Sequence, residues 1–161
     1  LEIDLNAVEP VAACPHRVDL VEPVRELSDT PVQMGLPGTC TNGRISDFRA
    51  ALDILDGRQL CPDFQLLVVP ASRKIYAEMA ENRMLARFAE LDAIILPPSC
   101  GPCCGSSSGT LSDGVNVIST ANCNFIGRMG NVKSNIYLAS PATVAASAIT
   151  GKITDPREVF A

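Results

Sequence analysis

Short apolar runs alternate with helical segments along most of this chain, and this alternation restricts the possible folds more than any other feature. The runs at 64–70 (FQLLVVP) and 93–98 (AIILPP) are continuously apolar, which is typical of strands buried on both faces. Two further runs, 30–36 (TPVQMGL) and 115–119 (VNVIS), also predict strands. We therefore expect residues 1–161 to form a single α/β domain with three αβα layers and a mostly parallel sheet.

Two helical regions lie between these strands. In residues 44–55 the apolar side chains recur on one face of a helix, and Gly57 marks its end. Residues 74–91 predict one or two helices with a break near Asn82.

The two ends of the chain are less regular. Residues 140–151 predict a helix, with Ser140 as N-cap and Gly151 just past the last turn. Residues 1–5 (LEIDL) alternate as a half-buried strand does, whereas residues 8–27 predict irregular structure with a short helix near their end.

The charge pattern excludes several classes of protein. The net charge is −5 and the 13 Lys and Arg residues are scattered, so the basic stripe of a nucleic-acid-binding protein is missing. No run reaches the roughly 18 apolar residues of a membrane span. The first residues are acidic, unlike a signal peptide, and the chain does not begin with Met. We expect a piece of a longer cytoplasmic protein, with no nucleic-acid or membrane partner.

Cysteine is the residue type most informative about chemistry. The chain has seven, and in a reducing compartment clustered cysteines indicate metal binding or redox chemistry more often than disulfides. Cys40 directly follows the predicted strand 30–36, and Cys100 and Cys103 follow the strand 93–98. Because ligands bind beyond the carboxyl ends of parallel strands, these three thiols are predicted to meet over one crevice.

The residues alone leave three readings of this crevice open. A Cys-x-x-Cys pair serves zinc sites, thiol oxidoreductases and iron–sulfur clusters alike. A structural zinc site needs four ligands, yet there is no second such pair, and His16, the only histidine, is distant in sequence. A redox pair usually opens a helix, whereas Cys103 leads into CGSSSG. An iron–sulfur site is favoured over zinc and thiol redox chemistry.

The amino-acid sequences of the loops resemble those of the aconitase superfamily. The stretches that carry the resemblance are, in family order, AACPHRVDLVEPVREL, GTCTNGRISDFRAA, PSCGPCCG, STANCNFIGRMG and SPATVAASAITGKITDP. Within the superfamily, the short spacing and the GRISDFRAA wording are most similar to the large subunit of 3-isopropylmalate dehydratase. The large subunits of homoaconitase and dimethylmalate dehydratase are close alternatives.

This resemblance implies a cofactor and a reaction. Cys40, Cys100 and Cys103 would each bind one iron of a 4Fe–4S cluster, which leaves the fourth iron open as a Lewis acid. The activity would be that of a hydro-lyase that isomerises a small hydroxy-dicarboxylate by dehydration and rehydration, as in leucine biosynthesis. Arg128 and Asn122 match positions that line the substrate pocket, where a guanidinium suits a carboxylate.

The resemblance also implies that the active site is incomplete here. The family supplies its catalytic serine from a swivelling domain or small subunit, so we assign no catalytic residue within this chain and expect it to be inactive when isolated. Two residues depart from the family pattern: Cys123 replaces the usual Arg, and Cys104 replaces an apolar residue. Either thiol is an alternative fourth ligand that would close the open iron. A non-catalytic iron–sulfur module and a structural zinc domain remain the alternatives.

Overall fold

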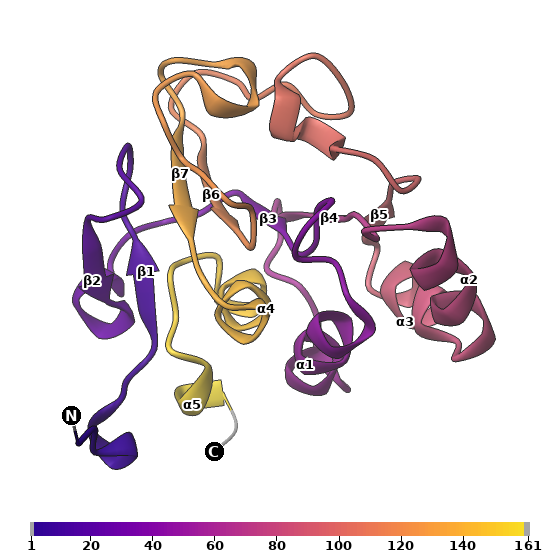
Figure 1. Ribbon diagram of the computed structural model, residues 1–161, viewed down its shortest axis with the longest axis horizontal. Coiled ribbons are helices and arrows are strands. Elements are labelled where there is room, and N and C mark those ends of the chain that lie inside the picture. Colours follow the sequence, from indigo (N-terminus) through magenta and orange to yellow (C-terminus); the bar gives the residue numbers. More distant parts are fainter. Residues whose placement is uncertain (1, 160–161) are drawn as a thin grey trace.

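A seven-stranded sheet lies at the centre of the computed structural model, which describes residues 2–159 (Figure 1). The strand order is β2-β1-β7-β6-β3-β4-β5. The last five strands of this order are parallel, and β1 and β2 add an antiparallel pair at one edge. The strands are β1 (Val11–Ala13), β2 (Val21–Pro23), β3 (Met34–Leu36), β4 (Gln65–Val68), β5 (Ile94–Ile95), β6 (Asn116–Ser119) and β7 (Asn135–Leu138).

The predicted α/β class and mostly parallel sheet are confirmed. The runs 30–36, 64–70 and 115–119 contain β3, β4 and β6. The run 93–98 contains β5, but the prediction that it is buried on both faces was wrong. Because β5 is an edge strand, Ile94 is 44% exposed.

The N-terminal predictions needed two corrections. The predicted strand 1–5 is absent from its described part, where residues 2–4 lack regular structure and Leu5 begins a 3₁₀ turn, η1 (Leu5–Ala7); Leu1 lies outside the described residues. Residues 8–27 are not irregular but form β1 and β2, and their expected short helix is the 3₁₀ turn η2 (Val24–Leu27). β1 pairs with β7, and this pairing joins the two short strands to the sheet. The sequence analysis did not predict it.

The three helical predictions are confirmed. The region 44–55 forms α1 (Ile45–Leu55), and 140–151 forms α4 (Pro141–Thr150), where the Ser140 hydroxyl accepts the Thr143 N–H at 3.1 Å. Residues 74–91 form α2 (Arg73–Glu81) and α3 (Met84–Glu90), separated at Asn82 and Arg83. A short α5 (Pro156–Val159) was not predicted.

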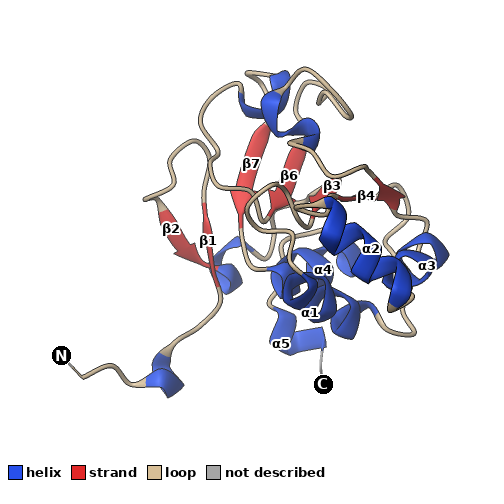
Figure 2. Cartoon of the chain, turned by 45° about the vertical axis from the view of Figure 1, so that its right-hand side comes forward, coloured by secondary structure: helices blue, strands red, loops and turns tan. Residues whose placement is uncertain are grey.

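Two apolar clusters pack on opposite faces of the sheet. The α-helices cover one face (Figure 2). They do so with side chains such as Leu52 and Val144, and there the ring of Phe88 meets that of Phe48 edge-on at 5.9 Å. The other face carries Leu36, Leu67 and Met129, and loops and 3₁₀ turns cover it. Residues 2–159 therefore supply one helical layer and not the two of the expected αβα arrangement. Among residues 2–159, no helix combines the length and apolarity that crossing a membrane requires.

Candidate metal centre

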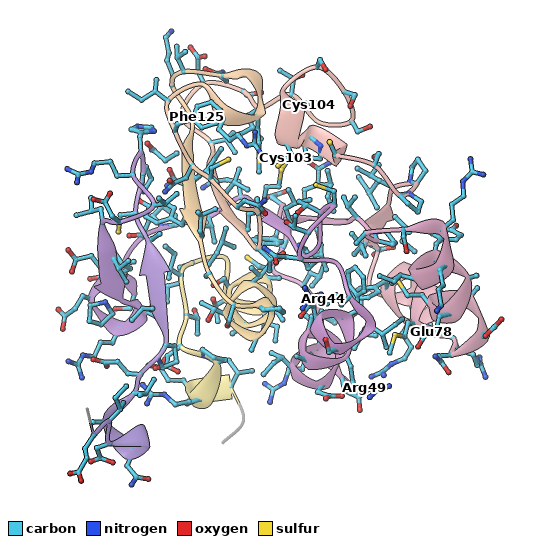
Figure 3. All side chains as sticks on the ribbon, viewed as in Figure 1. Arg44, Arg49, Glu78, Cys103, Cys104 and Phe125 are labelled. Carbon is cyan, nitrogen blue, oxygen red and sulfur yellow. The ribbon has the colours of Figure 1, made fainter. Side chains whose placement is uncertain are left out.

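Three loops meet at the carboxyl ends of the parallel strands. The Cys40 loop (37–44) follows β3, the Cys103 loop (99–114) follows β5, and the Arg128 loop (120–131) follows β6. Because β6, β3, β4 and β5 are consecutive and parallel, their carboxyl ends share one edge of the sheet. Figure 3 shows Cys103, Cys104 and Phe125 at this end of the molecule, away from Arg49 and Glu78 on the helices.

The end of β4 supports two of the three loops. The Val69 N–H donates to the Pro37 carbonyl at 3.2 Å, and the Ala71 N–H donates to the Gly43 carbonyl at 3.1 Å, which ties the Cys40 loop to this strand end. The Val69 side chain also lies against Gly101 in the Cys103 loop, where an added Cβ would approach it to 3.0 Å. The loops that carry the predicted ligands are therefore held together through Val69.

Hydrogen bonds tie the Cys40 loop to the Arg128 loop. The Asn42 amide donates to the Thr120 carbonyl at 2.6 Å, and the Thr41 hydroxyl donates to Oδ1 of Asn122. Asn122 was predicted to face substrate. It lies beside the Cys40 loop, and its amide oxygen accepts the hydrogen bond from Thr41. Thr120, whose carbonyl accepts the hydrogen bond from Asn42, was not identified as a site residue from the sequence.

Two glycines bring the Cys103 and Arg128 loops into backbone contact. A Cβ on Gly105 would lie 2.6 Å from the Gly130 nitrogen, and one on Gly130 would lie 2.7 Å from the Gly105 carbonyl oxygen. Both residues also have positive φ, +73° and +92°, a conformation that glycine adopts without strain. The 3₁₀ turn η3 (Gly101–Cys104) therefore packs directly on η4 (Arg128–Gly130).

This packing places Arg128 against a predicted cluster ligand. Its Nη2 donates to Sγ of Cys103 at 2.6 Å, and its guanidinium carbon lies 5.4 Å from the centre of the Phe125 ring. Its Nε is buried and has no hydrogen-bond partner among the described residues. The structure thus adds a contact that sequence reasoning missed, since Arg128 was expected only to face substrate.

The predicted ligands differ in exposure. Cys103 is only 6% exposed, and burial raises the pKa of its thiol while the charge and hydrogen bond of Arg128 oppose that shift. Negative charge on Cys123 and Cys40 also raises the pKa of the Cys103 thiol, and the loops that carry these residues meet at one edge of the sheet. Cys40 is exposed, as is Cys100, which precedes η3 by one residue.

The donor groups at this site are chemically suited to a cluster. Within residues 2–159, no three His, Cys, Asp or Glu side chains gather closely enough to hold one metal ion. In a cubane each thiolate binds a different iron, so the ligand sulfurs stand apart. Three thiols, Cys40 on one loop and Cys100 and Cys103 on another, with a guanidinium and glycine-rich backbone around them, are a suitable donor set for such a group.

The remaining cysteines lie outside this ligand set. The Cys104 thiol is exposed and turned toward the Ser106 hydroxyl at 3.3 Å; this bond first, then the Ser106 backbone and Ser107, lowers its pKa to about 7. Cys14 and Cys61 are half-buried. All seven cysteines, each within the described part of the chain, are free thiols.

Comparisons with known proteins relate this sequence to one family. The sequence profile of the Aconitase family (aconitate hydratase) matches residues 21–151. Large subunit 1 of 3-isopropylmalate dehydratase from Thermotoga maritima is 50% identical over 159 residues, and large subunit 2 from Archaeoglobus fulgidus is 47% identical over 156. These alignments cover 98% and 97% of this chain but only 38% of each relative, so the chain spans less than two fifths of their length.

Proposed function

Because this chain belongs to the aconitase family, we propose that it is the cluster-bearing part of a hydro-lyase that isomerises a hydroxy-dicarboxylate by dehydration and rehydration. The names of its relatives favour 3-isopropylmalate as the substrate, with the substrates of homoaconitase and dimethylmalate dehydratase as the alternatives. The observation that carries the proposal is the meeting of three loops at one sheet edge, with Cys103 held by Arg128.

The proposed cofactor is a 4Fe–4S cluster on Cys40, Cys100 and Cys103. When bound, it supplies an iron without a protein thiolate, which acts as a Lewis acid toward a substrate hydroxyl. The unpartnered, buried Nε of Arg128 supports this assignment, because such a donor is costly unless an acceptor from outside the chain completes it.

The chain's own residues would bind and orient the substrate. Thr41 occupies the Asn122 amide oxygen, which leaves the amide nitrogen to donate to a substrate oxygen. The Arg128 guanidinium carries five N–H donors, of which one reaches Cys103, so others remain for a carboxylate. We assign no proton-transfer step to these residues.

The rest of the reaction is proposed to need other parts of the protein. The relatives are named large subunits and are much longer than this chain. We propose that the remaining large-subunit segments and a small subunit or swivelling domain supply the proton-transferring group. A cytoplasmic location suits the free cysteines, which persist in a reducing compartment.

Anaerobic reconstitution with iron and sulfide tests the cofactor. We expect about four irons per chain and a broad visible absorbance. Changing Cys40, Cys100 or Cys103 to Ser abolishes this absorbance, whereas the control Cys61→Ser leaves it intact because Cys61 packs against Gly151 and not in the crevice. Loss of the cluster in the control, or one stoichiometric zinc and no iron in the protein, contradicts the assignment.

A second candidate, a non-catalytic iron–sulfur module, is favoured by one observation. Cys123 lies near enough to Cys103 for its charge to act on that thiol, and a fourth thiolate would close the open iron. Air exposure followed by electron paramagnetic resonance separates the two candidates. An open cluster loses its unprotected iron and gives a three-iron signal, whereas a cluster that keeps four irons favours the module, and Cys123→Ser then restores iron loss.

A further inference from the structure

Substrate binding alone does not explain two features of Arg128. Its guanidinium donates a hydrogen bond to the Cys103 sulfur, and its Nε is buried without a partner among the described residues. We propose, building on the proposed cluster, that Arg128 is an electrostatic partner of that cluster: its hydrogen bond to the Cys103 sulfur raises the reduction potential and holds this ligand in place. The role is additional to any contact with substrate. Arg128 is thus a positioning and tuning residue, acting through Cys103.

The contact is short and fixed from several sides. Nη2 of Arg128 lies 2.6 Å from Sγ of Cys103, within reach of a charged hydrogen bond. The Phe125 ring lies 5.4 Å from the guanidinium carbon, on the same loop, and supports the cation through its face. The backbone contact of Gly105 with Gly130 sets the distance between the two turns. Arg128 therefore does not reach Cys103 by chance rotation of a free surface side chain.

Burial makes this contact effective. Cys103 is 6% exposed, whereas Cys40 and Cys100 are exposed to solvent. Water can hydrogen-bond and screen the two exposed sulfurs, but it reaches Cys103 poorly, so a fixed positive charge there acts in a lower dielectric. Hydrogen bonds to the sulfurs and nearby charge are two of the features that set cluster potentials. A cationic donor on a cluster thiolate favours the reduced, more negative state.

A second nitrogen of Arg128, Nε, supports the proposed role independently. Nε of Arg128 is buried and finds no acceptor within residues 2–159. Buried donors are almost always paired, so an unpaired one marks a place for an acceptor that the chain does not provide. The guanidinium can hold Cys103 through Nη2 while Nε meets a negatively charged group that enters the site.

The test measures the cluster potential, which does not depend on turnover. Arg128→Gln, Arg128→Lys and the control Arg49→Gln are made in the full-length protein that contains this segment and are reconstituted anaerobically. Arg49 is exposed on α1, far from the site in Figure 3. Spectroelectrochemistry without substrate is expected to give a more negative potential for Arg128→Gln, a smaller shift for Arg128→Lys, which keeps the charge, and no shift for Arg49→Gln.

The possible outcomes separate a failure of the proposed function from a failure of the inference about Arg128. If the parent forms no cluster, the proposed function itself fails. If the parent forms one and Arg128→Gln leaves its potential unchanged, only the inference about Arg128 is overturned. If both Arg128 variants fail to load, urea unfolding of the cluster-free proteins decides: unchanged unfolding supports a role in holding Cys103 for the cluster, whereas a matching loss of stability shows a merely structural role and overturns the inference.

Discussion

Replacing Gly105 by Ala is expected to separate the two 3₁₀ turns η3 and η4, which carry Cys103 and Arg128. An added Cβ would stand 2.6 Å from the Gly130 nitrogen and 2.8 Å from its Cα, both backbone atoms that no side-chain rotation can move away. Gly105 also has a φ of +73°. The substitution therefore meets both backbone strain and a steric clash at the contact between η3 and η4.

The magnitude follows from these two causes. A left-handed conformation costs an L-residue roughly 1–2 kcal/mol. Alanine also makes the unfolded chain less flexible than glycine does, and this stabilises the folded state by roughly 0.4–1 kcal/mol. Forcing an extra methyl group into packed structure adds roughly 1–3 kcal/mol. We expect Gly105→Ala to lower the free energy of unfolding by about 1–4.6 kcal/mol in total.

Urea unfolding of the cluster-free protein measures this loss, and Gly57→Ala is the matched control. Gly57 has a similar φ of +67°, but an added Cβ there meets nothing within 4 Å. It therefore reports backbone strain alone, about 1 kcal/mol or less. Equal losses in the two variants refute the claimed contact between the turns. Gly105→Ala should also weaken cluster loading, because it displaces Cys103 from Arg128, whereas Gly57→Ala should not.

Three further outcomes are expected. Phe88→Ala lowers the free energy of unfolding, measured in urea, by about 3–5 kcal/mol, because the ring is fully buried against Phe48. The control Tyr76→Ala, at an exposed position, changes it by about 0.5 kcal/mol. The Arg157 side chain lowers the pKa of Asp155, so Asp155→Asn destabilises at neutral pH, and its difference from the parent shrinks as pH falls below about 4 in urea titrations. The isolated chain shows no dehydratase turnover in a substrate assay, even with its cluster; turnover would contradict the need for other segments.

The fold was predictable where local sequence determines structure. Residues 64–70 are apolar apart from Gln65 and contain β4, whose other side chains are buried in the apolar clusters on the two faces of the sheet. The three-residue strand β1 carries no comparable signal, since its place depends on pairing with β7, where Ala13 faces Leu138. The exposure of Ile94 likewise depends on β5 being the last strand of the sheet, which no local pattern records.

The site was predictable only as far as its loops. The position of Cys40 after one apolar strand and of Cys103 after another predicted that their loops meet, and the structure brings both loops to one edge of the sheet. The partner of Arg128 was not predictable, because the guanidinium meets Cys103 across 25 positions of chain. That contact depends on the approach of Gly105 to Gly130, and a glycine in a loop does not by itself reveal which backbone it lies against.

The three proposed ligands are therefore chemically unequal, which bears on how the centre works. Cys103 is buried and neutralised by a fixed cation, so its environment changes little when anything binds. Cys40 and Cys100 are exposed, and their environment depends on what covers them. Covering exposed thiolates removes water and strengthens every charge interaction around them. Under the proposed assignment, the chain's own Arg128 sets the charge around the Cys103 ligand, whereas the charge around Cys40 and Cys100 depends on what covers these exposed thiols.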